Sequence, residues 1–159
     1  MTFRKLQWMF PIAVTLHNAE EAIWMPRWTD GHAMQFPVHP PGAAEIIAAL
    51  VVFTVAAFVV TYLSVRHGPE SIWAYLTFGY IVAMLANVFV PHVPAAFVFR
   101  GYAPGLVTAV LINLPVMSLL TFRMLREGWV HGWKVAVFGI GVPLILGGVI
   151  VAWLAGRII

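Results

Sequence analysis

Long runs of apolar residues alternate with short polar segments along this chain. A helix that crosses a lipid bilayer needs about 20 mostly apolar residues. Five runs reach or approach this length, and they cover residues 6–25, 43–64, 72–90, 103–122 and 135–155. The pattern predicts an all-α fold, a polytopic membrane bundle of about five transmembrane helices that forms one domain over residues 1–159.

The first apolar run is the least regular, because residues 17–21 in its second half read HNAEE. Arg4 and Lys5 would suit the charged start of a signal peptide. However, two glutamates stand where the small residues of a cleavage site belong. We therefore expect a retained first span, and a segment lying in the membrane interface is the alternative.

The composition agrees with a membrane protein and excludes several other classes. Hydrophobic residues make up 62% of the chain and charged residues 9%, whereas soluble domains are about 25% charged. The absence of cysteine excludes disulfides, thiolate ligands and a cysteine nucleophile. The net charge of +3 comes from basic residues scattered singly between apolar runs, which argues against nucleic acid as a partner.

The basic residues also predict an orientation, since loops on the cytoplasmic side carry an excess of Lys and Arg. With the N-terminus inside, the inner side carries six of them: Arg4, Lys5, Arg66, Arg123, Arg126 and Lys134. The outer side carries three: Arg27, Arg100 and Arg157. We expect the N-terminus inside. The outer loop at residues 26–42, rich in proline and apolar side chains, is then predicted to cap the helix ends; the roles of its His32 and His39 stay open.

His17, Glu20 and Glu21 are unexpected inside an apolar run. Spacings of three and four residues place both glutamates on the same helix face as His17. An ionised side chain at the bilayer centre costs about 2.5–3.5 kcal/mol, so the cluster requires a cation, a shared proton or donors from other helices. Candidates at the same depth are His92 and the segment 102–105. We expect Asn87 and Asn113 to hydrogen-bond between helices rather than take part in chemistry.

These residues also carry a family resemblance. The chain reads H-x-x-E-E at residues 17–21, a histidine at His92 and Y-x-P-G at residues 102–105, in that order. Over roughly residues 6–155 it resembles the HXXEE-domain family of small bacterial membrane proteins, whose function is unknown. The resemblance implies that the motif residues form one site, in a protein of the bacterial cytoplasmic membrane. Those residues are His17, Glu20, Glu21, His92, Tyr102, Pro104 and Gly105.

Histidine and carboxylate ligands suit zinc, iron or manganese. We expect His17, His92 and one of Glu20 and Glu21 to bind a divalent metal, zinc or iron. The second glutamate is then the general acid or base, and Tyr102 orients the substrate. A metal-bound water could attack an ester or amide, so the leading hypothesis is a metal-dependent, hydrolase-like enzyme acting on a lipophilic, membrane-borne molecule.

Three other interpretations remain. A buried histidine beside a glutamate can move protons without a metal, as in a lipid isomerase. The same carboxylates could serve a proton- or cation-coupled transporter or binding protein, although no polar stripe continues to the inner side. Finally, the cluster could be a polar contact that only fixes helix packing.

Overall fold

The computed structural model describes residues 2–35 and 41–155, and within them it is helical with no strand. The first half contains α1 (Phe3–Leu6), α2 (Met9–Gly31), a 3₁₀ turn η1 (Ala33–Gln35), α3 (Ala43–His67) and α4 (Ile72–Asn87). The second half contains the π turn η2 (Val88–His92), α5 (Val93–Val98), α6 (Leu106–Thr108), the π turn η3 (Ala109–Asn113), α7 (Leu114–Arg126) and α8 (Trp133–Ala155). The predicted all-α fold is confirmed.

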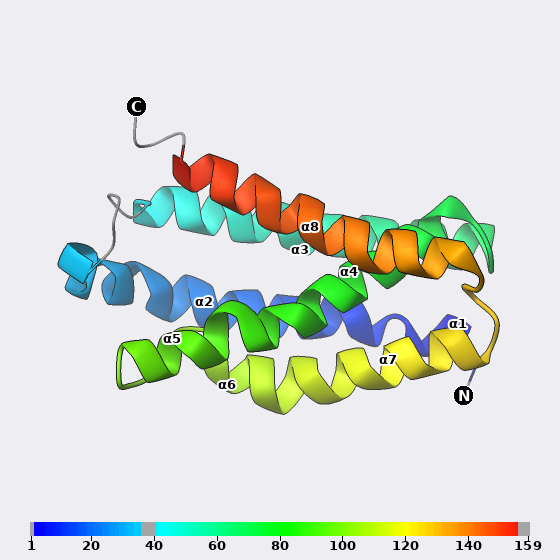
Figure 1. Ribbon diagram of the computed structural model, residues 1–159, viewed down its shortest axis with the longest axis horizontal. Coiled ribbons are helices and arrows are strands. Elements are labelled where there is room, and N and C mark those ends of the chain that lie inside the picture. Colours follow the sequence, from blue (N-terminus) through cyan, green and yellow to red (C-terminus); the bar gives the residue numbers. More distant parts are fainter. Residues whose placement is uncertain (1, 36–40, 156–159) are drawn as a thin grey trace.

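The long helices run side by side along the long axis of the molecule (Figure 1). Two of them are compound: α4, η2 and α5 follow one another without a gap, as do α6, η3 and α7. The α4 helix packs against α3, α7 and α8. The N-terminal end of α2 lies at the end of the bundle where α7 finishes and α8 begins. The C-terminal end of α2 lies at the other end, beside α5.

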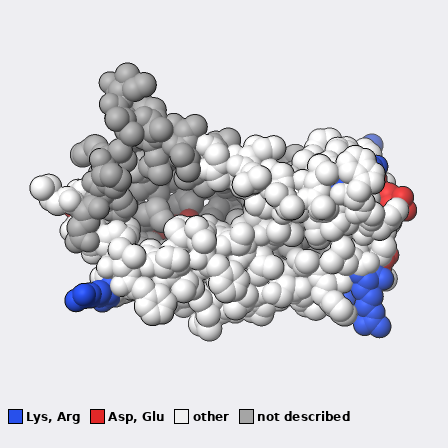
Figure 2. Space-filling view, in the orientation of Figure 1, with Lys and Arg blue, Asp and Glu red and all other residues white. Residues whose placement is uncertain are grey.

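Three helical segments are long and apolar enough to cross a membrane. They are Ala43–His67, Ile72–Val98 and Leu106–Arg126, with mean hydropathies of 2.7, 1.9 and 1.7. Trp133–Gly148 is a shorter apolar helix within the described side chains. The α2 helix is long enough, but its polar side chains lower its hydropathy. In Figure 2 the Lys and Arg side chains lie at the two ends of the face, with mostly uncharged surface between them. This arrangement is compatible with a membrane protein.

The helix ends in the structure differ from two predicted boundaries. Residues 26–42 do not form one loop, because α2 continues through Pro26 to Gly31 and η1 follows. The Thr29 hydroxyl lies 2.9 Å from the carbonyl oxygens of both Met25 and Pro26, so the continued turn keeps its carbonyls partnered. The predicted span 72–90 lies within the longer helical segment Ile72–Val98, in which α4 gives way to a π turn after Asn87.

Interhelical hydrogen bonds from buried polar side chains fix the bundle around the site. The Tyr80 hydroxyl on α4 donates to the Phe53 carbonyl on α3 at 2.9 Å. The Tyr80 ring meets Phe10 of α2 edge to face, with centroids 5.1 Å apart. The Asn18 amide nitrogen of α2 donates to the Leu50 carbonyl at 3.1 Å. These contacts set how α2 is turned toward the rest of the bundle.

Candidate functional site: a buried His–Glu–His cluster

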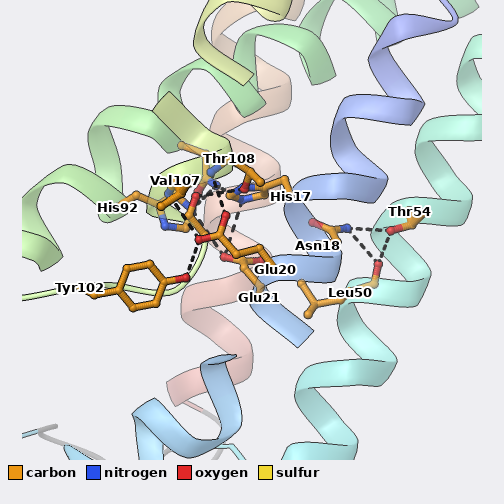
Figure 3. Close-up of polar contacts among 12 residues, drawn as sticks. His17, Asn18, Glu20, Glu21, Leu50, Thr54, His92, Tyr102, Val107 and Thr108 are labelled. Carbon is orange, nitrogen blue, oxygen red and sulfur yellow. Dashed lines mark hydrogen bonds and ion pairs between the residues drawn. The ribbon is translucent and has the colours of Figure 1, made fainter. Parts of the chain in front are cut away.

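Three side chains from two separate segments converge beside the middle of α2 (Figure 3). His17 and Glu21 are one turn apart on α2, and His17 Nε2 lies 3.7 Å from Glu21 Oε1. His92, the last residue of η2, places its Nε2 atom 3.5 Å from the same carboxylate oxygen. The two imidazole rings meet edge to face with centroids 4.8 Å apart. His17, His92 and Glu21 are 1%, 3% and 8% exposed, so the cluster is buried.

The spacing of these atoms suits a metal ion. One ligand atom from each of His17, Glu21 and His92 lies within 4.8 Å of the other two. Nitrogen and oxygen ligands about 2.0–2.2 Å from a tetrahedral zinc ion lie roughly 3.3–3.6 Å apart. The 3.5 and 3.7 Å separations are close to that value. The donor set of two imidazoles and one carboxylate is one that zinc, iron and manganese accept.

The outward sides of both rings are also partnered. His17 Nδ1 lies 3.0 Å from the Thr108 hydroxyl, and that hydroxyl donates to the Gly105 carbonyl at 3.3 Å. The His92 ring hydrogen-bonds the backbone of Pro104, whose only polar backbone group is its carbonyl. A metal-binding histidine commonly donates its second ring N–H to such an acceptor, which fixes its tautomer and orientation.

Gly105 makes this close approach possible. Its φ is +81°, a region that glycine adopts without steric cost. A Cβ atom there would lie 2.6 Å from His92 Cε1, 2.8 Å from His17 Cε1 and 3.0 Å from Glu21 Cγ. The glycine of the Y-x-P-G segment therefore belongs to the site, because a side chain at this position would collide with all three cluster residues.

Glu20 lies outside this cluster and has a different set of partners. Its carboxylate accepts hydrogen bonds from the Thr108 backbone N–H at 2.8 Å and the Val107 N–H at 3.4 Å. These amides open the helix that begins at Leu106, and the N-terminus of a helix favours negative charge. The Tyr102 hydroxyl also donates to Glu20, at 2.5 Å. Partial burial, together with the Glu20 carboxylate, raises the pKa of Tyr102 above its ordinary value, so the phenol remains a donor.

An open groove of about 520 Å³ adjoins this second set of contacts. Its lining residues are Glu20, Trp24, Tyr102, Val107 and Thr108. Thr108 belongs to both parts of the site, because its backbone N–H binds Glu20 while its hydroxyl contacts His17. The groove is therefore one side chain away from the buried cluster.

Of the four predicted metal ligands, the structure brings three together, namely His17, Glu21 and His92. The fourth, Glu20, lies beside Tyr102 instead. The structure also adds Asn87, whose amide nitrogen lies 2.9 Å from His92 Nε2 and 3.4 Å from His17 Nε2. The sequence signal for Asn87 is its position five residues before His92, with Pro91 between them. The role of His32 was left open by the sequence, and its ring lies against Trp28, with centroids 4.7 Å apart. His39 lies outside the described residues.

Comparison with known proteins places these residues in a family. The family described as a protein of unknown function with an HXXEE motif matches residues 8–120, a range that contains every residue of the cluster and the groove. The chain belongs to this family. An uncharacterized protein of Bacillus subtilis (strain 168), YrkK, is 36% identical over 126 residues, which cover 79% of this chain and 77% of the relative. No solved structure matches the chain.

Proposed function

We propose that the protein is a metal-dependent enzyme of the bacterial cytoplasmic membrane that acts on a lipophilic, membrane-borne substrate. The observation that carries the proposal is the burial of two imidazole nitrogens around one carboxylate oxygen, at 3.7 and 3.5 Å. Ionisable groups buried in a membrane protein are expensive and mark functional sites by default. A divalent cation shared by the three side chains offsets that cost.

Each residue has a role in this proposal. His17, His92 and Glu21 hold zinc or iron, which would supply Lewis acidity and an activated water. Glu20 and Tyr102 face the groove, where they orient the polar end of a substrate whose apolar part contacts Trp24 and Val107. The reaction class that fits these groups is hydrolysis of an ester or amide.

Metal retention in two adjacent glutamate variants tests the proposal. Glu21→Gln weakens a ligand, whereas Glu20→Gln alters a residue that binds backbone amides and Tyr102. The measurement is elemental analysis of detergent-purified protein, before and after loading with zinc or iron. We expect stoichiometric metal in the parent and in Glu20→Gln, weaker retention in Glu21→Gln, and loss of the metal in Glu21→Ala and His17→Ala.

The outcomes separate the alternatives. A folded parent that takes up no metal even after loading overturns the proposal. Full occupancy in Glu21→Ala removes Glu21 from the ligand set, and loss of metal in Glu20→Gln alone reverses the two glutamate roles.

Metal-free acid–base chemistry is a second candidate, and the 2.5 Å contact between Tyr102 and Glu20 at the groove favours it. A carboxylate beside a phenol can move a proton on a bound lipid, as a double-bond isomerase requires. This candidate predicts that activity on isoprenoid or sterol-like lipids survives metal removal but not Glu20→Gln.

A further inference from the structure

Asn87 lies at the point where the regular hydrogen bonding of α4 stops. It is the last residue of α4, and the π turn Val88–His92 follows it. Pro91 has no backbone N–H, and Val90 adopts φ −147° and ψ 110°, outside the helical region. Because the chain leaves helical geometry at Val90, His92 does not continue the spiral of α4, and its side chain meets that of Asn87 five residues earlier.

The Asn87 side chain contacts both imidazoles on the side that faces Glu21. Its amide nitrogen lies 2.9 Å from His92 Nε2 and 3.4 Å from His17 Nε2. These two ring nitrogens are the same atoms that approach Glu21 Oε1. An amide NH₂ group only donates, so both Nε2 atoms accept here and each neutral ring carries its proton on Nδ1. The Thr108 and Pro104 contacts of the two rings agree with this assignment.

An NH₂ group in this position competes with a cation, since both bind the ring lone pairs. When a cation takes those lone pairs, the hydrogen bonds from Asn87 are lost. Rotation of the Asn87 amide by half a turn about the Cβ–Cγ bond then places its oxygen where the nitrogen was. This oxygen has two lone pairs that can bind the cation. We propose that Asn87 is the fourth protein ligand of the metal centre, through Oδ1; this inference rests on the metal site proposed above.

The resulting set of two imidazole nitrogens, a carboxylate oxygen and an amide oxygen contains no sulfur. Hard and borderline ions, namely zinc, iron(II) and manganese(II), suit such a set better than copper(I). Water or substrate then enters as a fifth ligand, which zinc accepts in the transition states of hydrolytic enzymes. The assignment explains why a polar amide is placed against two buried histidines.

The test compares the metal affinity of Asn87→Ala and Asn87→Asp with that of the parent, by competition with a chromogenic chelator in detergent. Asn113→Ala is the matched control, because Asn113 is fully buried and is the last residue of the π turn η3, while neither of its amide atoms has a hydrogen-bond partner in the described structure. The visible spectrum of each Co²⁺-loaded protein reports any change in coordination.

A ligand role predicts that Asn87→Ala binds zinc weaker by about tenfold or more and shifts the Co²⁺ spectrum, while Asn87→Asp and Asn113→Ala bind at least as tightly as the parent. If Asn87 only donates to the rings, Asn87→Ala removes a competitor and binds as tightly or more tightly, which overturns the inference. If Asn87→Ala does not fold, the test depends on Asn87→Asp, and weaker zinc binding by this variant than by the parent overturns the inference. A parent without metal affinity overturns the metal site itself, and with it this ligand.

Discussion

His17 and Thr108 are far apart in the sequence, yet the Nδ1 atom of the histidine lies 3.0 Å from the threonine hydroxyl. The backbone N–H of the same threonine binds the Glu20 carboxylate at 2.8 Å. One residue at the start of the helix Leu106–Arg126 thus holds two of the three ionisable side chains of the H-x-x-E-E motif, and it separates the buried cluster from the groove.

Replacing Thr108 with valine removes the hydroxyl and keeps both the shape of the side chain and the backbone N–H. His17 then loses the partner that orients its ring, and loss of such a partner weakens metal binding by about 10–100-fold. Chelator competition measures the effect. Thr108→Ser keeps the hydroxyl and serves as the control, so equal affinities in the two variants would show that the hydroxyl does not position the ring.

Gly105→Ala should damage the site more than its backbone conformation alone explains. A non-glycine residue at positive φ costs roughly 1–2 kcal/mol, and the new Cβ would also lie within 3.0 Å of atoms in all three cluster residues. Gly128→Ala is the control, because Gly128 has φ +69° with nothing within 4 Å of its Cβ position. Thermal unfolding should show destabilisation in both variants. Metal content should fall in Gly105→Ala alone, and equal retention in the two would contradict the predicted crowding.

Glu127 makes the stability of the opposite end of the bundle depend on pH. Its carboxylate accepts the Phe3 backbone N–H at 2.8 Å and pairs with Arg123. These contacts lower the pKa of Glu127 below its ordinary value of 4.5. The carboxylate therefore stabilises the folded chain above pH 4.5, and this contribution is lost as the pH falls through the lowered pKa.

Melting temperatures of the parent and Glu127→Gln check this prediction. The variant should melt lower at neutral pH and match the parent in strong acid, where both side chains are uncharged. A difference that stays constant across the range would assign the effect to packing rather than to charge.

The absence of cysteine from the chain gives a direct test of orientation. Gly101 and Glu70 are exposed and lie at opposite ends of the bundle. A cysteine introduced at either position would be the single thiol of its variant, because the chain has no other. With the N-terminus inside, a membrane-impermeant maleimide should label Gly101→Cys on intact cells and Glu70→Cys only after lysis. The reverse pattern would invert the orientation, and labelling of both on intact cells would contradict a crossing between them.

Helix positions and the shared face of His17 and Glu21 could be predicted from the sequence, because apolar run length and a four-residue spacing determine them locally. The choice between Glu20 and Glu21 could not. Both flank His17 on α2, and their roles depend on which face meets η2 and which meets the helix beginning at Leu106. That information belongs to the packing of distant segments.

The contact of Asn87 with the cluster could not be predicted from the sequence for a different reason. Helical spacing pairs residues three or four apart, whereas Asn87 and His92 are five apart and meet where the helix is interrupted at Val90 and Pro91. Pro91 indicated an interruption, but not that the chain would continue as a helix beyond it. The motif includes Gly105, but its close approach to His17 and His92 could not be predicted, because that approach depends on segments remote in the sequence.

The burial of the two histidine rings also has a kinetic consequence. An ion held between them could exchange only when α2 and the 102–105 segment move apart, since Gly105 closes over both rings. Release would then follow the rate of that opening rather than the strength of the metal–ligand bonds, and a soluble chelator would remove the ion slowly. The metal retained through purification would therefore record what the cell supplied while the protein was folding.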